Sequence, residues 1–503
     1  MKTYLVSILL GCVVGLFCLG FRWGIEELQT LRNGFWLNGW PAFLKIPLYI
    51  ALIYPVLLFV SRMMERYPVL AGNGAEQTKG ILNGHLPRKH AFRFLIRKFF
   101  GAIVSLGSGM ALGREGPSIQ FGGYWGIILS RICRIKPGRQ EFLISAGASA
   151  GVAAALDAAL GGPIYIIESL QKLNNYRIAI CSLLSGLTAG LLAGLLMPVN
   201  HYEAIRLVRP VVTDGCLLGI FVGMGFFLAV IGLLFTVSVW GLRFLFNRYP
   251  GHKSFRLFLF AIWLALIGHF MPLLLGSGQD FMISQALDGT LLISEALVYA
   301  TTYFLFAVFS QAFTFPGGAF LPLLTLGGLC GRLFGLILMA YGVCGHESLS
   351  YFMFLGMCGS FIVVMRTPLT GILLVTEMTS HYEILLPAMA VGVIGYFMIS
   401  VVRITSFPTD LYQQLLHNVN ARFRKDLNVW MEVMPYSYFE GKTPQTVDLP
   451  YGCTIAGILR DEKMITFDAG ETLNAGDQVY FAIQSTEADR IYQALLSMSS
   501  DQE

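Results

Sequence analysis

The sequence predicts a polytopic α-helical membrane protein, and three observations support that prediction. Hydrophobic residues make up 55% of the 503 residues, charged residues make up only 13%, and the mean hydropathy is +0.64. Apolar runs recur along most of the chain, and each is close to the length that a helix needs to cross a bilayer. Several runs contain glycine or proline near the middle, which favours re-entrant or interrupted helices over a simple bundle.

The expected membrane segments are apolar runs separated by more polar stretches. They are Tyr4–Leu19, Phe43–Val60, Phe142–Leu170, Ile178–Leu196, Cys216–Val239, Leu257–Leu275, Leu297–Phe313, Leu321–Met339 and Phe352–Val402. The first run resembles a signal peptide, but Lys2 is its only leading charge and Arg22 follows without a small-residue cleavage site. We expect this run to be retained as a membrane helix.

The charged and metal-binding residue types exclude several kinds of partner. The basic segments Arg88–Lys98, Arg131–Arg139 and Arg422–Lys425 belong on the cytoplasmic side by the positive-inside rule. That bias accounts for the formal net charge of +5 and leaves no reason to expect a nucleic-acid partner. The nine cysteines contain no CxxC pair, and the eight histidines, including His90 and His381, show no ligand spacing. We therefore expect no disulfide framework, no metal site and no cofactor.

The most informative short motif is Gly113-Arg114-Glu115-Gly116-Pro117, which places a carboxylate between apolar stretches. A glutamate at membrane depth costs at least a few kcal/mol unless it faces a polar pathway or a partner. The glycines suit an interrupted helix, whose free N–H groups and positive dipole end attract anions. Glu115 is therefore predicted to occupy an anion-binding position and to vacate it on protonation. The alternative is that it lies in a loop just outside the bilayer.

A weak internal repeat runs through the chain at a nearly fixed offset. Glu168 follows Ala159–Gly162 as Glu377 follows Pro368–Gly371, and the two acids stand 209 residues apart (377 − 168 = 209). Because other pairs recur in the same order, a duplicated membrane unit explains the similarity better than chance does.

Two of those other pairs are built on glycine. Gly147 and Gly356 share the same offset (356 − 147 = 209), and the G-x-x-x-P segment Gly113–Pro117 recurs as Gly318–Pro322 (318 − 113 = 205). Proline near a helix start gives up an N–H that would be unpaired there. Transporter repeats are often inverted, and their broken helices point N-termini at a central site. We expect both G-x-x-x-P segments to face a shared anion site near the membrane midplane.

Three motifs together resemble a known family. Gly113–Pro117, Gly318–Pro322 and the segment from Arg366-Thr367-Pro368 through Glu377-Met378-Thr379 closely resemble the signatures of the CLC family of chloride channels and proton-coupled anion exchangers. The resemblance covers roughly residues 1–419, in the expected order. It implies a CLC-type inverted repeat of short, tilted and interrupted helices. It also implies a homodimer in which each subunit has its own anion pathway.

The resemblance also implies roles for single residues. Glu115 corresponds to the gating glutamate, which competes with the anion for an outer site and carries the proton when displaced. The expected anion-binding residues are Asn73, Arg114, Gly116, Ala319, Phe320, Leu321 and Tyr412, most of them through backbone amides. Tyr412 corresponds to the tyrosine whose hydroxyl closes the central site from inside. The residues before it, Phe407–Asp410, depart from the family pattern, and a tyrosine there also suits a membrane interface.

The first departure from the family lies in the first anion motif, which usually reads G-S-G-x-P. This chain has Gly72-Asn73-Gly74-Ala75-Glu76 at that place. Asn73 still offers N–H donors but is larger and adds a carbonyl. Variation at this position accompanies altered anion choice in the family, and one branch resembles fluoride/proton antiporters. Glu76 replaces the proline, and the simplest interpretation is that it caps a helix start.

Two further departures concern acids in the first half of the repeat. The inner proton-transfer glutamate of the family falls at Ser169, with Glu168 one residue earlier, and that shift turns a side chain by about 100° around a helix. The usual Asn-Ala-Pro is here Asp157-Ala158-Ala159. An acid at the depth of Asp157 should either pair or line water.

A soluble tail follows the membrane part, which we place at residues 1–419. Residues 428–503 contain strand-like segments, Thr454–Leu459 and Gln478–Ile483, and a helix signal in Glu487–Ser497 with Thr486 as a candidate N-cap. The turn Asn474–Asp477 resembles the TrkA-C (RCK-C) domain of potassium-transport proteins. Such domains bind small regulatory ligands or form dimer contacts, and no nucleotide fingerprint appears in this one.

The sequence therefore predicts a proton-coupled halide transporter of the cell membrane with a cytoplasmic α+β tail. Chloride/proton exchange gated by Glu115 is the first expectation, with membrane lipid, anion and protons as partners. Fluoride/proton antiport and passive, voltage-gated chloride conduction are the alternatives. An intramembrane enzyme is not expected, since no serine–histidine, HExxH or aspartate-rich motif is found.

Overall fold

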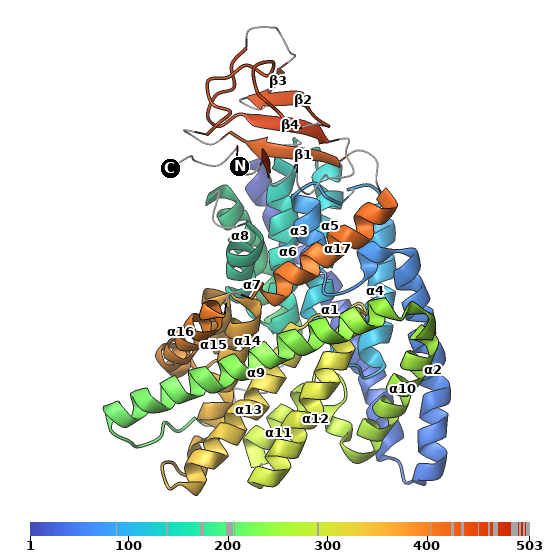
Figure 1. Cartoon of the computed structure of the whole chain (residues 1–503), viewed down its shortest axis with the longest axis vertical. Helices are drawn as coiled ribbons and strands as arrows, with labels where there is room; N and C mark the ends of the chain where they lie inside the picture. The colour runs from blue at the N-terminus through green and yellow to red at the C-terminus, as the bar shows by residue number, and fades with distance from the viewer. Residues whose placement is uncertain are drawn as a thin grey trace.

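The computed structural model describes most of the chain. The residues left undescribed are 87, 137–138, 172–175, 198–204, 206, 289–290, 403, 424–426, 434–436, 451, 461–462, 466–470, 484–490, 492–493, 496–497 and 499–503. The remainder forms a helical body with a small sheet at one end, and the N-terminus lies at the same end as the sheet (Figure 1).

The helical body consists of two successive groups of helices. The first is α1 (Lys2–Leu37), α2 (Ala42–Arg66), α3 (Ala75–Leu82), α4 (Ala91–Gly107), α5 (Glu115–Ile132), α6 (Gln140–Leu156), α7 (Gly161–Tyr165) and α8 (Tyr176–Leu196). The second is α9 (Asp214–Arg248), α10 (Lys253–Phe270), α11 (Gln279–Asp288), α12 (Ile293–Ala312), α13 (Phe320–Ala340), α14 (Leu349–Met365), α15 (Pro368–Thr379), α16 (Leu385–Val401) and α17 (Phe407–Phe423).

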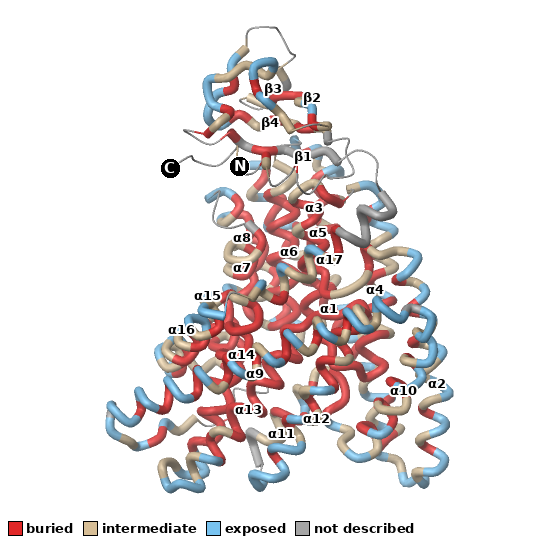
Figure 2. Tube along the Cα trace, viewed as in Figure 1, coloured by how far each residue is buried: buried red, intermediate tan, exposed pale blue. Residues whose placement is uncertain are grey.

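Burial divides the helices into a central column and an apolar periphery. All of α14 and nearly all of α6 are buried, whereas α2 and α9 expose large apolar side chains such as Phe59 and Phe226 (Figure 2). Within the described residues, nine helices are long and apolar enough to cross a membrane. An apolar outer surface suits lipid rather than water. The molecule is thus a multi-pass membrane protein, as the composition predicts.

Two long apolar runs are interrupted, as their glycines and prolines predict. The run Phe142–Leu170 breaks where α6 ends at Asp157, whose φ is 54°, and α7 then begins. The run Phe352–Val402 breaks where α14 ends at Arg366, whose φ is 59°, and Pro368 opens α15. Both breaks therefore use a non-glycine residue in the left-handed conformation, which few side chains adopt without cost.

The duplication is visible in matched helix pairs. Helices α6 and α14 both have 17 residues and begin 209 residues apart (349 − 140 = 209). Each packs on the helix before it, α5 and α13 respectively. At both contacts backbone meets backbone, because a Cβ on Gly147 would overlap the carbonyl of Gly122, and one on Gly356 that of Gly327. The two repeated glycines thus permit the same close helix crossing in each half.

The tail forms a four-stranded antiparallel sheet in the order β1-β4-β2-β3. Its strands are β1 (Leu427–Glu432), β2 (Cys453–Arg460), β3 (Lys463–Ile465) and β4 (Gln478–Ile483). The two predicted strands match β2 and β4, and the predicted turn contains Gly476 with a φ of 90°. The expected helix Glu487–Ser497, with its cap Thr486, lies largely outside the described residues. Two described members, Ile491 and Leu495, pack into the sheet's core.

Candidate functional site

The centre of the molecule is a meeting point of helix starts. Helix α5 begins at Glu115 and α13 begins at Phe320. The glycines before them form an antiparallel bridge, in which the Gly113 N–H donates to Gly318 O at 2.8 Å and the Gly318 N–H donates to Gly113 O at 2.6 Å. Each repeat half therefore contributes one positive helix end to the same point.

A third helix start joins them. Helix α3 begins after Gly74, whose φ is 98°, and a Cβ on that residue would overlap the carbonyl of Gly116. A Cβ on Gly116 would in turn overlap the backbone and amide oxygens of Asn73 and approach the Cα of Gly318. Only glycine permits this approach of three backbones.

The carboxylate of Glu115 fills the gap between α5 and α13. Glu115 is 0% exposed, and its Oε1 accepts a hydrogen bond from the Phe320 N–H at 2.7 Å. Its Oε2 has no hydrogen-bond partner among the described residues. A Cβ on Gly113 or Gly318 would overlap this carboxylate. The side chain thus holds a buried position beside helix N–H donors, which is the environment that an anion would share.

The remaining predicted residues of this group surround the carboxylate. Arg114 is the N-cap residue of α5, but its guanidinium turns away, with Nε donating to Ala155 O at 2.7 Å and Nη1 3.9 Å from Glu26 Oε1. Ala319 is the N-cap residue of α13 and is buried, as is Leu321 in the first turn. The backbone starts of both helices are therefore in place around Glu115.

Asn73 lies between the backbone beside Glu115 and a second acid, Glu76. Its Nδ2 donates to Glu76 Oε1 at 3.1 Å, and its Oδ1 is buried against Gly116 with no partner among the described residues. The structure therefore places six other predicted residues, by side chain or by backbone, around Glu115: Asn73, Arg114, Gly116, Ala319, Phe320 and Leu321.

Tyr412 is not part of this cluster. It lies on α17, and its hydroxyl accepts a hydrogen bond from Asn83 Nδ2 at 3.0 Å and lies 2.5 Å from His85 Nδ1. Asn83 follows the last turn of α3, whereas Asn73 precedes its first turn. The structure thus places the Tyr412 hydroxyl at the other end of α3 from Asn73.

Two cavities approach the cluster. The α17 cavity, of about 410 Å³, is lined by Asn73, Glu76, Arg243, Gln311 and Gln414 together with residues of α2 and α17. The α1 cavity, of about 380 Å³, is lined by residues of α1 and by Arg114 and Leu321. Leu112 lines both cavities. The segment that leads to Glu115 therefore borders both cavities.

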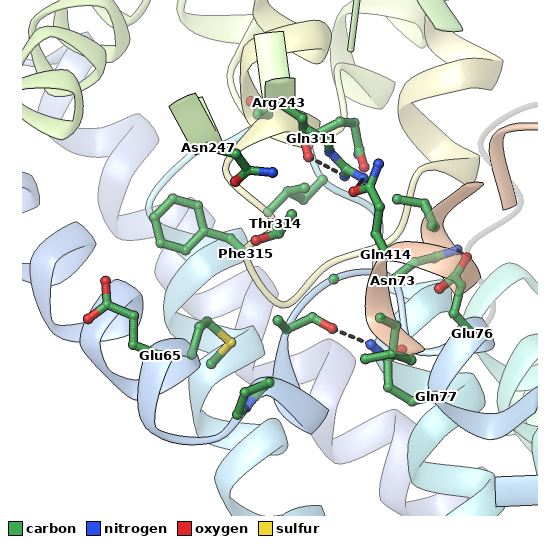
Figure 3. Close-up of a pocket in the computed structure, with 18 of the residues that line it drawn as sticks. Glu65, Asn73, Glu76, Gln77, Arg243, Asn247, Gln311, Thr314, Phe315 and Gln414 are labelled. Atoms are coloured by element: carbon green, nitrogen blue, oxygen red, sulfur yellow. Dashed lines mark hydrogen bonds between the residues drawn. The ribbon is translucent and has the colours of Figure 1, made fainter. Parts of the chain in front are cut away.

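The wall of the α17 cavity contains a buried cation that the sequence did not single out. Arg243 is buried, and its Nη2 donates to Gln311 O at 2.6 Å while its Nη1 donates to Gln414 Oε1 at 3.1 Å (Figure 3). Gln414 Nε2 in turn donates to Asp410 Oδ2 at 2.7 Å. A buried arginine on an apolar helix is the signal in the sequence that identifies such a residue.

The acids that departed from the family pattern have definite partners. Asp157 accepts from Arg22 Nη1 with both oxygens at 2.9 Å, so it pairs rather than lining water. Glu168 accepts from the Leu369 N–H at 3.1 Å and from the N–H and hydroxyl of Thr370 at 2.8 and 2.6 Å. It thus caps the start of α15.

The same cap exists in the other half. Glu377, at the end of α15, accepts from the N–H groups of Leu160 and Gly161 at the start of α7 at 2.7 to 3.0 Å. Each repeat half therefore caps the short helix of the other with the acid at the 209-residue offset. Only the offset in the sequence pointed to this pairing.

This architecture defines the class of protein. Interrupted helices from two repeated halves meet with their N-termini at a buried acid, as in membrane transport proteins with discontinuous helices. The family model for voltage gated chloride channels matches residues 56–400, and the TrkA-C domain model matches residues 428–496. The chain therefore belongs to the voltage gated chloride channel (CLC) family and carries a TrkA-C domain.

Individual relatives agree with this assignment. The chain is 30% identical over 426 residues to the H(+)/Cl(−) exchange transporter ClcA of Vibrio cholerae serotype O1, covering 82% of this chain and 88% of the relative. Its fold matches the crystal structure of a slow cyanobacterial Cl−/H+ antiporter with a TM-score of 0.74 at 24% identity, covering 84% of this chain and 99% of the other. It also matches a CLC-type fluoride/proton antiporter with a TM-score of 0.63 at 18% identity, covering 79% and 94%.

Proposed function

We propose that this protein exchanges chloride for protons across the cell membrane, with Glu115 as both gate and proton carrier. One observation carries the proposal. The Glu115 carboxylate is buried and accepts the Phe320 N–H at the start of α13, and its chain neighbours Leu112 and Arg114 line the two cavities. An anion and this carboxylate therefore compete for the same donors.

The proposed cycle follows from that competition. A charged carboxylate is held by the positive helix ends, whereas a protonated one loses that attraction. Protonation lets the side chain leave, and an anion from either cavity then takes its place at the helix N-termini. Return of the carboxylate expels the anion and releases the proton on the other side. In this cycle chloride and protons therefore cross the membrane in opposite directions.

The named relatives support chloride and protons as the transported ions. A relative that matches 82% of this chain is named for H+/Cl− exchange. The family model is named for voltage gated chloride channels, so passive conduction is the alternative. A passive channel would use Glu115 only as a gate.

The position of Asn73 favours fluoride/proton antiport as the second candidate function. Its amide nitrogen is directed to Glu76, and its oxygen faces Gly116 at the centre of the cluster. A hydroxyl donor of the usual family motif is therefore absent from this position. We propose chloride as the first substrate, and the flux ratio of the two halides decides between them.

The proposed orientation rests on the distribution of basic residues. The Arg131 guanidinium donates to Arg88 O at 2.7 Å, so the first two basic segments share one end of the molecule. The positive-inside rule assigns this end to the cytoplasm. We propose that the TrkA-C domain is cytoplasmic, that it responds to a small ligand or stabilises assembly, and that the protein is a homodimer.

Flux measurements on reconstituted vesicles test the proposed function. Vesicles loaded with chloride at equal internal and external pH should take up protons as chloride leaves, and the uptake should continue against an opposing proton gradient. A passive channel would show chloride efflux without uphill proton movement. Replacement of chloride by fluoride in the same assay identifies the preferred halide.

A further inference from the structure

Glu76 is a second buried carboxylate beside the site, and the proposed cycle does not yet use it. It lies in the first turn of α3, is 4% exposed, and lines the α17 cavity beside Asn73 (Figure 3). A buried acid at membrane depth is costly unless it has a partner or a function.

Asn73 links Glu76 to the backbone beside Glu115. Asn73 donates to Glu76 Oε1 at 3.1 Å with its Nδ2, and its Oδ1 lies against Gly116, the neighbour of Glu115. The buried phenol of Tyr165 from α7 lies within electrostatic reach of both carboxylates. Its hydroxyl can donate and accept, as a proton path requires.

Two cations lie near Glu76 but form no salt bridge with it among the described residues. Lys98 on α4 and Arg243 on α9 lie within electrostatic reach of the carboxylate. Lys98 Nζ donates instead to the carbonyls of Leu70 and Gly72, each at 2.8 Å, and Arg243 donates to groups of α12 and α17. In the part of the chain that the structure describes, no salt bridge joins Glu76 to either cation. A change of its charge therefore breaks no ion pair.

The position where the family carries its inner acid has no carboxylate here. It is Ser169, and the neighbouring Glu168 is held by the start of α15 through three hydrogen bonds. Glu76 is thus the acid that combines contact with the α17 cavity and proximity to Glu115.

We propose that Glu76 is the proton-transfer residue on the side of the α17 cavity. This inference rests on the proposed exchange function. Glu76 takes a proton from water in the cavity, becoming a neutral carboxyl group. It then passes that proton towards Glu115 and returns to a carboxylate, ready for the next cycle. The competing structural role is that Glu76 only stabilises the start of α3 through the helix dipole.

The full-length protein in chloride-loaded vesicles tests the assignment through simultaneous chloride and proton fluxes. Glu76→Gln should retain chloride flux and lower proton flux about a hundredfold or more, the scale on which positioned acids act. Glu65→Gln is the matched control, because Glu65 lines the same cavity but is 55% exposed in its side chain and pairs with Lys253. This control should leave both fluxes unchanged.

Rescue and a second pair of variants sharpen the result. Ser169→Glu added to Glu76→Gln should restore part of the proton flux. If Glu76→Gln does not fold, Glu76→Asp and Glu76→Asn can be compared instead, because their side chains have the same size. Only Glu76→Asp should then support proton flux. An unchanged ratio of proton to chloride flux in Glu76→Gln, or in Glu76→Asn, overturns the inference alone. A wild-type protein that moves no protons overturns the proposed function and this inference with it.

Discussion

The two halves of the repeat share a scaffold but not a chemistry. Helices α6 and α14 have the same length, cross their neighbours at equivalent glycines, and end in left-handed residues 209 positions apart (366 − 157 = 209). The helix starts also correspond, yet the first half has Glu115 where the second has Phe320 (320 − 115 = 205). The second half supplies an N–H donor, and the first supplies the acid that occupies it. Duplication thus provides the donors, while one residue of the first half provides the buried acid.

The cross-caps show the opposite behaviour, because they are equal in both halves. Glu168 binds the start of α15 and Glu377 binds the start of α7. A carboxylate at a helix start satisfies free N–H groups and opposes the dipole. The comparison predicts that variants of the scaffold affect both halves alike, whereas variants of the site do not.

The largest effect is expected from Gly116→Val at the meeting point. The new side chain would overlap the backbone of Asn73 and the Cα of Gly318, neither of which can move freely. We expect both chloride and proton flux to be lost in vesicles. Gly20→Val is the control, since an added Cβ there meets nothing within 4 Å. Retained flux in Gly116→Val would show that the three helix starts do not form the pathway.

Removal of either cross-cap should reduce stability. Glu168→Gln and Glu377→Gln each weaken charge-assisted hydrogen bonds to a helix start, at a cost of about 1–3 kcal/mol. We expect similar losses for the two variants in thermal unfolding in detergent, with halide flux retained at low temperature. A large loss for one variant and none for the other would contradict the equivalence of the halves.

Asn73→Ser should change selectivity rather than rate. A serine hydroxyl replaces a larger amide that is directed to Glu76. Fluoride needs close donors to replace its hydration shell, so the fluoride-to-chloride flux ratio should shift by several fold, where about 1.4 kcal/mol corresponds to tenfold. Flux assays with each halide measure the ratio. An unchanged ratio would remove Asn73 from the selectivity argument.

The smallest effect on transport is expected from loss of the tail. Truncation after Val419 removes the sheet and the last turn of α17 but keeps every residue that lines either cavity. A regulatory tail can act only through different affinities for two states of the transporter. The truncated protein should therefore still transport chloride and protons in vesicles, and it should remain a dimer by light scattering. Loss of the dimer would instead assign the tail to assembly.

Local sequence predicted the parts of the site that depend on backbone. The G-x-x-x-P segments begin helices that meet, Glu115 lies at their junction, and strands β2 and β4 match the two strand-like segments predicted in the tail. Contacts between side chains of distant segments were not predictable. The pairing of Arg22 with Asp157 and the position of Tyr412 beside His85 depend on how helices pack, which no short motif encodes.

The most direct test of the central claim is the proton flux of Glu115→Gln in chloride-loaded vesicles. Glutamine has the size of the protonated acid but carries no transferable proton. We predict that chloride flux persists and that chloride-driven proton uptake falls to background. Proton uptake that continues unchanged in this variant would contradict the account, because Glu115 would then be neither the gate nor the proton carrier.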